Sequence, residues 1–175
     1  WEIGNLLLPK MGEPITLFTG KHANKRAGKW VDEIRTNAGA RTLSAFDDRT
    51  ELYKRAKTEV VALLGDLKPP KAPVQVKFFG METAAAQGGP LLALLNKVDF
   101  IYFSCVKVGD KLKARFKKIE YSTENKRKEN IKLLAQGFFD ELEVDIKNYP
   151  EQYFWMHSRW KDNPDIKYED KEALL

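Results

Sequence analysis

The sequence predicts an α/β domain with a mixed, mostly parallel sheet flanked by helices, and three observations lead to this class. Short apolar runs typical of strands alternate along the chain with segments whose apolar residues recur at helical spacing. Gly109-Asp110 separates two longer alternating runs, which is typical of a β-hairpin. The 175 residues, 43% hydrophobic and 31% charged, are enough for one globular core.

The first half of the chain alternates between strand and helix patterns. The predicted strands cover residues 15–18, 41–43 and 60–64. The opening residues are predicted to be the end of a helix that stops near Gly12-Glu13-Pro14, and further helices are predicted over residues 24–37 and about 47–56. The helix over 24–37 is expected to bury four apolar side chains that share one face, Ala27, Trp30, Val31 and Ile34. The run over 60–64 is apolar throughout, so we expect a fully buried strand that leads to Asp66 in the following loop.

The second half adds the hairpin and the longest helix. Further strands are predicted over residues 74–79, 100–108 and 111–121, and helices over 83–95 and 123–147. The long helix is expected to bury apolar residues at helical spacing, namely Ile131, Leu134, Phe138, Leu142 and Ile146. We expect one domain over residues 1–161, followed by a polar tail over 162–175.

The net charge of +5 favours a negatively charged partner, and anionic lipid, nucleic acid and an acidic carrier protein all fit it. A single cysteine, Cys105, excludes a framework of structural disulfides and is typical of a reducing compartment. The sequence contains no apolar run near the roughly 20 residues that a bilayer-spanning helix needs. It opens on Trp1-Glu2-Ile3 without an initiator methionine, so we interpret it as part of a longer protein.

Two polar residues are candidates for a site on position alone, and each has a structural alternative. Asp66 follows a strand, where open α/β sheets bind ligands, but it could equally cap a turn. Arg35 ends a helix and could clamp an anion, although a cation is favoured at a helix C-terminus in any case. The sequence shows no Gly-rich phosphate loop, metal-spaced cluster or nucleophile elbow. We interpret His22 as a surface residue and His157 as structural.

Aromatic and basic residues alternate in residues 149–161, which read Tyr-Pro-Glu-Gln-Tyr-Phe-Trp-Met-His-Ser-Arg-Trp-Lys. Such a segment could contact a membrane surface, or it could pack its aromatic rings against the core. From Pro150 onward it resembles the closing signature of the lipid A late acyltransferases, the lauroyl and myristoyl transferase family. Phe78-Phe79-Gly80 followed by Thr83 is a second match, and Asn24, Arg35 and Asp66 lie at spacings similar to those of the family's polar positions.

The resemblance implies a glycerolipid-acyltransferase-like fold and a transferase of bacterial lipid A (lipopolysaccharide) biosynthesis. Trp1-Glu2 looks like the end of the family motif His-x-Gly-Asn-Trp-Glu, so the catalytic histidine and a membrane anchor would precede this chain. The histidine would take the proton from a lipid hydroxyl as that oxygen attacks an acyl thioester. Glu2 would orient the imidazole. The chain alone is then expected to be soluble and inactive.

The implied catalytic residues are Glu2, Arg35 and Asp66, and the implied substrate-binding residues are Asn24, Thr83, Arg159 and Lys161. The acyl donor would be acyl carrier protein or coenzyme A, and the acceptor a glycolipid at the cytoplasmic face of the inner membrane. No metal or cofactor is implied beyond the thioester co-substrate. Nucleic acid is not an expected partner, because the basic residues at 111, 113, 115 and 117 fit a solvated strand face.

Three departures from the family pattern keep an alternative open. Leu67 stands where Gln or His often follows the aspartate, and Val106 stands near a usual arginine. Phe18-Thr19-Gly20 replaces a Tyr-Arg-Pro. An inactive homologue that binds lipid or carrier protein without turnover therefore remains the second hypothesis.

Overall fold

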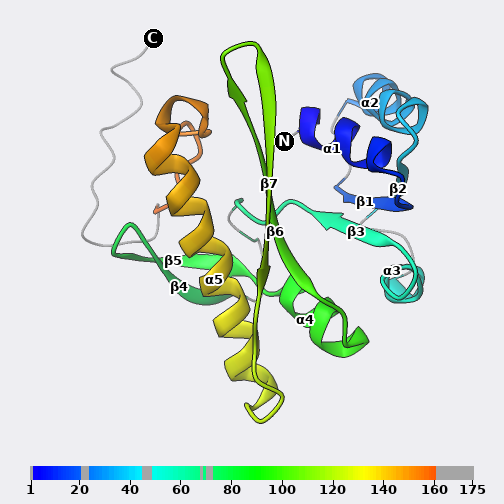
Figure 1. The fold of residues 1–175 in the computed structure, drawn as a ribbon. Coiled ribbons are helices and arrows are strands. Elements are labelled where there is room, and N and C mark those ends of the chain that lie inside the picture. Colours follow the sequence, from blue (N-terminus) through cyan, green and yellow to red (C-terminus); the bar gives the residue numbers. More distant parts are fainter. Residues whose placement is uncertain (1, 21–23, 45–48, 68, 70–72, 161–175) are drawn as a thin grey trace.

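The computed structural model describes residues 2–20, 24–44, 49–67, 69 and 73–160, and shows an α/β fold, as predicted (Figure 1). Its α-helices are α1 (Glu2–Leu7), α2 (Lys25–Asn37), α3 (Arg49–Arg55), α4 (Gly88–Asn96) and α5 (Arg127–Asn148). Two short 3-10 helices are η1 (Leu8–Met11) and η2 (Pro150–Gln152). The strands are β1 (Ile15–Thr19), β2 (Arg41–Ser44), β3 (Val60–Leu63), β4 (Pro73–Phe78), β5 (Met81–Ala86), β6 (Phe100–Val108) and β7 (Lys111–Ile119). The predicted polar tail lies outside the described residues.

The strands are divided over three sheets. β1 lies between β2 and β3 in a parallel sheet, with Leu17 opposite both Thr42 and Ala62. β4 pairs with β5 and β6 pairs with β7, each as an antiparallel hairpin. Figure 1 shows the parallel sheet with α1, α2 and α3 on one side of the molecule. It shows α5 and the β4–β5 hairpin on the other side, with the long β6–β7 hairpin between them.

The prediction that residues 60–64 form a fully buried strand is wrong. Val60, Leu63 and Leu64 are all exposed by more than a third of their surface. The reason is the strand order, because β3 is an edge strand of the parallel sheet and pairs only with β1. The central strand β1 contains the buried apolar pair instead, Ile15 and Leu17.

The prediction of a helix over 83–95 is wrong for its first residues, because Met81–Ala86 forms β5. Phe79 and Gly80 both have positive φ, 52° and 77°, and form the two-residue turn that joins β4 to β5. Glu143 of α5 accepts a hydrogen bond from the Phe79 N–H at 2.5 Å and so holds this turn. Ala-rich sequence favours helix locally, but pairing with β4 overrides that preference. The helix begins only at Gly88, with Pro90 in its first turn.

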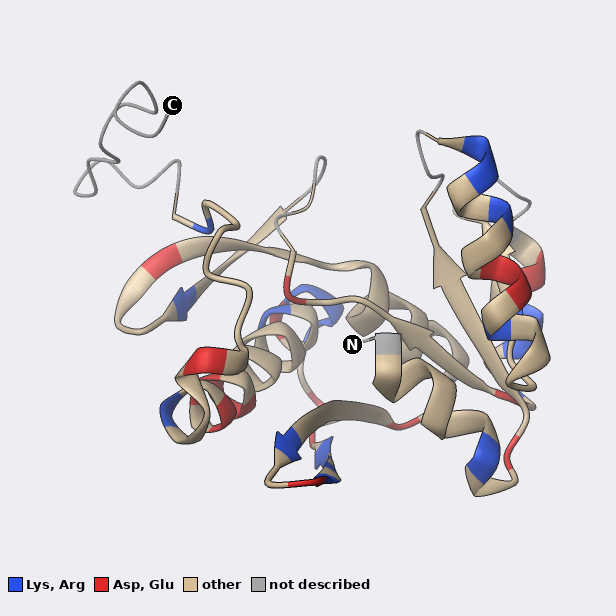
Figure 2. Cartoon of the chain, turned by 90° about the horizontal axis from the view of Figure 1, so that it is seen from above, with Lys and Arg blue, Asp and Glu red and all other residues tan. Residues whose placement is uncertain are grey.

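The predicted inner face of α2 is wrong in part, because Ala27 is exposed although Val31 and Ile34 are half-buried. Trp30 is 64% exposed, whereas Gly28 and Arg35 are the buried residues of this helix. Neighbouring residues in a helix differ by about 100°, so the helix is turned by about that angle from the expected face. Figure 2 shows the basic residues in the first turns of α2, followed by its acidic residues. The apolar periodicity located the helix but not the side that meets the protein.

α5 packs along the β6–β7 hairpin through both apolar and ionic contacts. Of its predicted core residues, Ile131, Leu134 and Ile146 are buried, and the other two are half-buried. The Tyr102 hydroxyl donates to Asp145 at 2.7 Å, and Arg115 Nε donates to the same carboxylate at 2.9 Å. Arg115 was predicted to lie on the solvated face of β7, but it is half-buried and contacts α5.

Two glutamine side chains attach to the free edges of strands. The Gln136 amide accepts from the Lys77 N–H at 2.7 Å and donates to the Lys77 carbonyl at 2.8 Å. Gln152 makes the same pair of bonds with the N–H and carbonyl of Lys107, at 2.7 and 2.9 Å. α5 is thereby bonded to β4, and the segment after α5 is bonded to β6.

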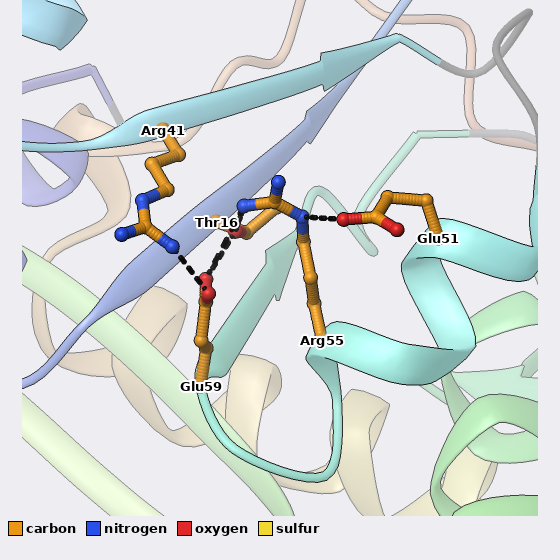
Figure 3. Close-up of polar contacts among 5 residues, drawn as sticks. All are labelled: Thr16, Arg41, Glu51, Arg55 and Glu59. Atoms are coloured by element: carbon orange, nitrogen blue, oxygen red, sulfur yellow. Dashed lines mark hydrogen bonds and ion pairs between the residues drawn. The ribbon is translucent and has the colours of Figure 1, made fainter.

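A carboxylate joins all three strands of the parallel sheet near the ends where they begin (Figure 3). Glu59, one residue before β3, accepts from the buried Thr16 hydroxyl of β1 at 2.6 Å and from Arg41 of β2 at 2.6 Å. Arg55 of α3 donates to the same Thr16 oxygen at 3.3 Å, and its Nε donates to Glu51 at 2.8 Å. The network fixes α3 and the three strands relative to one another.

Replacing Glu59 with Gln should lower the free energy of unfolding by about 1–3 kcal/mol, because one buried donor then faces an amide NH₂ group. The side chain of Glu59 is 10% exposed, whereas that of Glu33, which pairs with Lys29 at 3.8 Å, is 58% exposed. Glu33→Gln is therefore the matched control and should cost less than about 0.5 kcal/mol. Urea unfolding measures both, and equal losses would contradict the proposed importance of the network.

Candidate functional site

Asp66 lies in the loop that follows β3, at the carboxyl edge of the parallel sheet, as the sequence predicted. Its carboxylate is largely buried, and Oδ1 accepts no hydrogen bond from any residue that the structure describes. Burial raises the pKa of this carboxyl above its ordinary value. A hydrogen bond from the backbone of Asp66 itself, followed by the charges of Arg159 and His157, only partly opposes the rise. An unpartnered carboxylate oxygen is costly to bury, so this residue is a strong candidate for contact with a substrate.

Arg159 lies beside Asp66 and is 1% exposed. Its guanidinium donates to the carbonyl oxygen of Asp66 at 3.2 Å and to the carbonyl oxygen of Ala84 in β5. Its carbon Cζ lies 4.5 Å from the ring centroid of Phe139 in α5. Burial lowers the pKa of Arg159. The guanidinium thus binds the backbone of the Asp66 loop, and Oδ1 of the Asp66 carboxylate has no hydrogen-bond partner among the described residues.

Three further side chains complete the group that we call the Asp66 cluster: Thr83, Tyr153 and His157, with Asp66 and Arg159. The Thr83 hydroxyl donates to the Arg159 carbonyl at 3.0 Å and is buried. Burial, followed by the nearby Asp66 charge, raises the pKa of Tyr153 to about 12, so the phenol keeps its proton at neutral pH. The cluster therefore combines a carboxylate, a phenol, a hydroxyl and an imidazole around one loop.

The sequence interpretation overlooked Tyr153 and treated His157 as structural. Both belong to the segment after η2, which folds through short turns, with the N–H of Trp155 bonded to the Tyr153 carbonyl at 2.9 Å. These turns place residues 153, 157 and 159 near the same loop. The sequence feature that could have identified both residues is the segment 149–161, in which polar residues alternate with aromatic ones.

Arg35 is not brought together with Asp66. Its carbonyl accepts from the N–H of Ala40 at 3.0 Å, one residue before β2 begins. Because the strands are parallel, this places Arg35 at the amino edge of the sheet, whereas Asp66 follows the carboxyl end of β3. The Arg35 side chain is buried, with Asp32 at 3.5 Å.

The other predicted site residues are placed as follows. Asn24 caps α2, and its side chain accepts from the N–H groups of Arg26 and Ala27. Glu2 begins α1, but its side chain lies outside the described part of the structure, as does Lys161. Arg159, predicted to bind substrate, points into the protein, so its buried guanidinium acts on the Asp66 loop rather than on a headgroup at the surface.

No group of His, Cys, Asp or Glu side chains among the described residues is arranged to hold a metal ion. A hollow of about 160 Å³ beside Gln136 and Lys77 is lined by polar and charged side chains and is separate from the Asp66 cluster. Within the described residues, no helix combines the length and apolar character that crossing a bilayer requires.

Asp66→Asn should raise the free energy of unfolding near pH 7. The pKa of this carboxyl is higher in the folded than in the unfolded state, so ionisation above the unfolded pKa destabilises the fold. The gain should shrink as pH falls toward 4, because the carboxyl then begins to be protonated in the unfolded state as well as in the folded state. Asp99→Asn is the control, since that carboxylate is exposed and paired with Lys118 at 2.9 Å. Thermal unfolding from pH 4 to 8 tests this, and no gain at pH 7 would contradict it.

Arg159→Lys should lower the free energy of unfolding by about 1.5–3 kcal/mol, because an ammonium group cannot reproduce a planar fork aimed at two carbonyls. Amide hydrogen exchange should accelerate around Asp66 and Ala84. Arg41→Lys, on a largely exposed side chain, is the control and should cost less than about 1 kcal/mol. Unchanged exchange around Asp66 would show that Arg159 does not hold this loop.

The chain was compared with models of known protein families and with curated proteins. The family model for bacterial lipid A biosynthesis acyltransferases matches residues 1–162, which include every residue of the Asp66 cluster. A comparison with curated proteins gives no match. Because the family match extends over nearly the whole sequence, this chain belongs to the bacterial lipid A biosynthesis acyltransferase family.

Proposed function

We propose that this chain is part of an acyltransferase that moves a fatty acyl chain from a thioester of acyl carrier protein or coenzyme A to a hydroxyl of a lipid A-type glycolipid. The family match over residues 1–162 supports acyl transfer in lipid A biosynthesis. The observation that carries the proposal within the molecule is the unpartnered, buried carboxylate oxygen of Asp66 at the carboxyl edge of the parallel sheet. The reaction would take place at the cytoplasmic face of the bacterial inner membrane.

The proposed reaction is a direct displacement. A histidine four positions before Trp1 removes the proton from the acceptor hydroxyl, and the oxygen attacks the thioester carbonyl. The new C–O bond forms as the C–S bond breaks, and the carrier thiol leaves with the proton. Glu2 holds the imidazole in the required tautomer and stabilises its protonated form. No acyl-enzyme intermediate is required.

Asp66 is assigned to the acceptor. Its carboxylate oxygen accepts a hydrogen bond from a sugar hydroxyl, which replaces the partner that the protein does not supply. Arg159 is a positioning residue, because its guanidinium donates to the Asp66 backbone carbonyl and thereby holds the loop. Tyr153, which remains protonated at neutral pH, supplies a donor beside the same loop.

The net charge of the protein suits either acyl donor, because acyl carrier protein is acidic and coenzyme A carries phosphate groups. The chain carries 30 Lys and Arg against 25 Asp and Glu, and acidic proteins associate faster with basic surfaces. Both donors present the same thioester, so the chemistry is unchanged. An assay with one acyl chain on each donor separates them.

The chain beginning at Trp1 should show no transfer above background, whereas a version extended upstream through the motif should turn over. Loss of a general base costs about 10²–10⁴-fold in rate, so replacing that histidine by Ala should abolish the gain. Asp66→Asn in the extended version should lower kcat/KM although the protein is more stable. The assay follows labelled acyl transfer to a lipid A precursor.

Three outcomes of this assay would count against the proposal. Comparable turnover by the short and extended versions would contradict the assigned base. Full activity of the Asp66→Asn variant would contradict the role of Asp66. Binding of lipid without turnover by the extended version would favour the inactive homologue.

A further inference from the structure

Large apolar side chains are exposed next to one another after η2. Met156 is 88% exposed, and its neighbours Phe154 and Trp155 are each more than half exposed. In contrast, Tyr153, Arg159 and Trp160 of the same segment are at least partly buried. The segment therefore divides into inward residues, which form the Asp66 cluster and core, and an outward apolar group that the core does not require.

The tip of the β6–β7 hairpin carries further exposed apolar side chains. The Gln152 amide bonds to the backbone of Lys107, so the end of η2 lies beside the end of β6. Two apolar side chains at this end of the hairpin, Val108 and Leu112, are also exposed, one on each face, because Val108 pairs with Lys111 and Leu112 pairs with Lys107. We call these five side chains the apolar tip: Val108, Leu112, Phe154, Trp155 and Met156. In Figure 1 the turn of the hairpin reaches beyond the helices around it.

Lysines accompany the apolar tip. Lys107, Lys111 and Lys113 are exposed, and each faces or adjoins one of its residues on the paired strands, with Lys107 opposite Leu112 and Lys111 opposite Val108. Asp110 and Glu151 are the acidic residues nearest in sequence, so lysines are in excess. Apolar and aromatic side chains next to lysines are the combination that enters the headgroup region of an anionic bilayer.

The backbone around Trp155 is held in place. Its indole N–H donates to the Pro150 carbonyl at 2.6 Å, and its ring centroid lies 5.0 Å from that of Tyr153. The ring of Phe79, at the positive-φ position of the β4–β5 turn, lies 6.5 Å from Trp155. The apolar group is therefore presented outward by a defined structure that also contains the Asp66 cluster.

We infer that the apolar tip and its lysines form a contact surface for anionic phospholipid bilayers. The surface would bring the Asp66 cluster to the layer from which a glycolipid acceptor is taken, and in that respect the inference rests on the proposed function. A projecting two-stranded tip suits insertion between headgroups better than a broad protein–protein contact, which requires a larger matched area.

The test is co-sedimentation of the chain with vesicles of phosphatidylcholine alone or mixed with phosphatidylglycerol. Binding should require the anionic lipid and weaken as salt rises. Phe154→Ser with Met156→Ser should reduce binding about tenfold, since exposed apolar area is lost. Lys111→Gln with Lys113→Gln should reduce it about 25-fold, or roughly fivefold for each lysine. All four side chains are exposed, and circular dichroism verifies that the variants fold.

The matched controls carry the same changes at the opposite end of the molecule. Leu95→Ser with Leu133→Ser removes two exposed leucines of α4 and α5, and Lys128→Gln with Lys132→Gln removes two exposed lysines of α5. Neither pair should change binding by more than about twofold. Equal losses in controls and tip variants would overturn the inference.

Two other results would also overturn it. Undiminished binding by folded tip variants would place the lipid contact elsewhere. Tip variants that lose binding to an acidic acyl carrier protein, but bind vesicles as before, would assign the surface to a protein partner. Vesicle binding involves no turnover, so these outcomes are independent of whether the extended enzyme transfers acyl chains.

Discussion

The geometry of the candidate site depends on one buried cation. The Arg159 guanidinium joins the loop after β3 to β5 and packs on a ring of α5, so three elements from different sheets and layers meet at one side chain. Burying a charge is costly, and carbonyl oxygens together with an aromatic face offset that cost best for a planar, forked cation. In the same arrangement, Oδ1 of the neighbouring Asp66 carboxylate has no hydrogen-bond partner among the described residues. Arg159 thus stabilises the loop, and Asp66, which lies beside it in space, keeps one oxygen available for a substrate.

The fold was predictable wherever the signal is local. The hairpin turn at Gly109-Asp110 and the helical spacing from Ile131 to Ile146 depend on residues close in sequence, and both elements are present. The errors concern longer-range relations. Whether β3 is central or at an edge depends on strand order, and β5 exists because residues 81–86 return along β4. Neither relation is encoded in the periodicity of the segment itself.

The site was predicted one residue at a time and not as a group. Asp66, Thr83 and Arg159 were identified through a family resemblance, and the structure brings them together. Arg35 was identified in the same way but lies at the other edge of the sheet, since spacing along the chain does not reveal which end of a strand a residue reaches. Tyr153 and His157 join the cluster only because the segment after α5 folds back over β5.

The two glutamine attachments have a consequence for the behaviour of this protein in a cell. A hairpin that stands alone presents an unpaired row of N–H and carbonyl groups, which is a template for strand addition by another chain. Each glutamine amide reproduces a peptide group and occupies the site where an incoming strand would begin to pair, on β4 at Lys77 and on β6 at Lys107. On β4 and β6 the fold thus covers one pairing position of each edge with a side chain and not with a further strand.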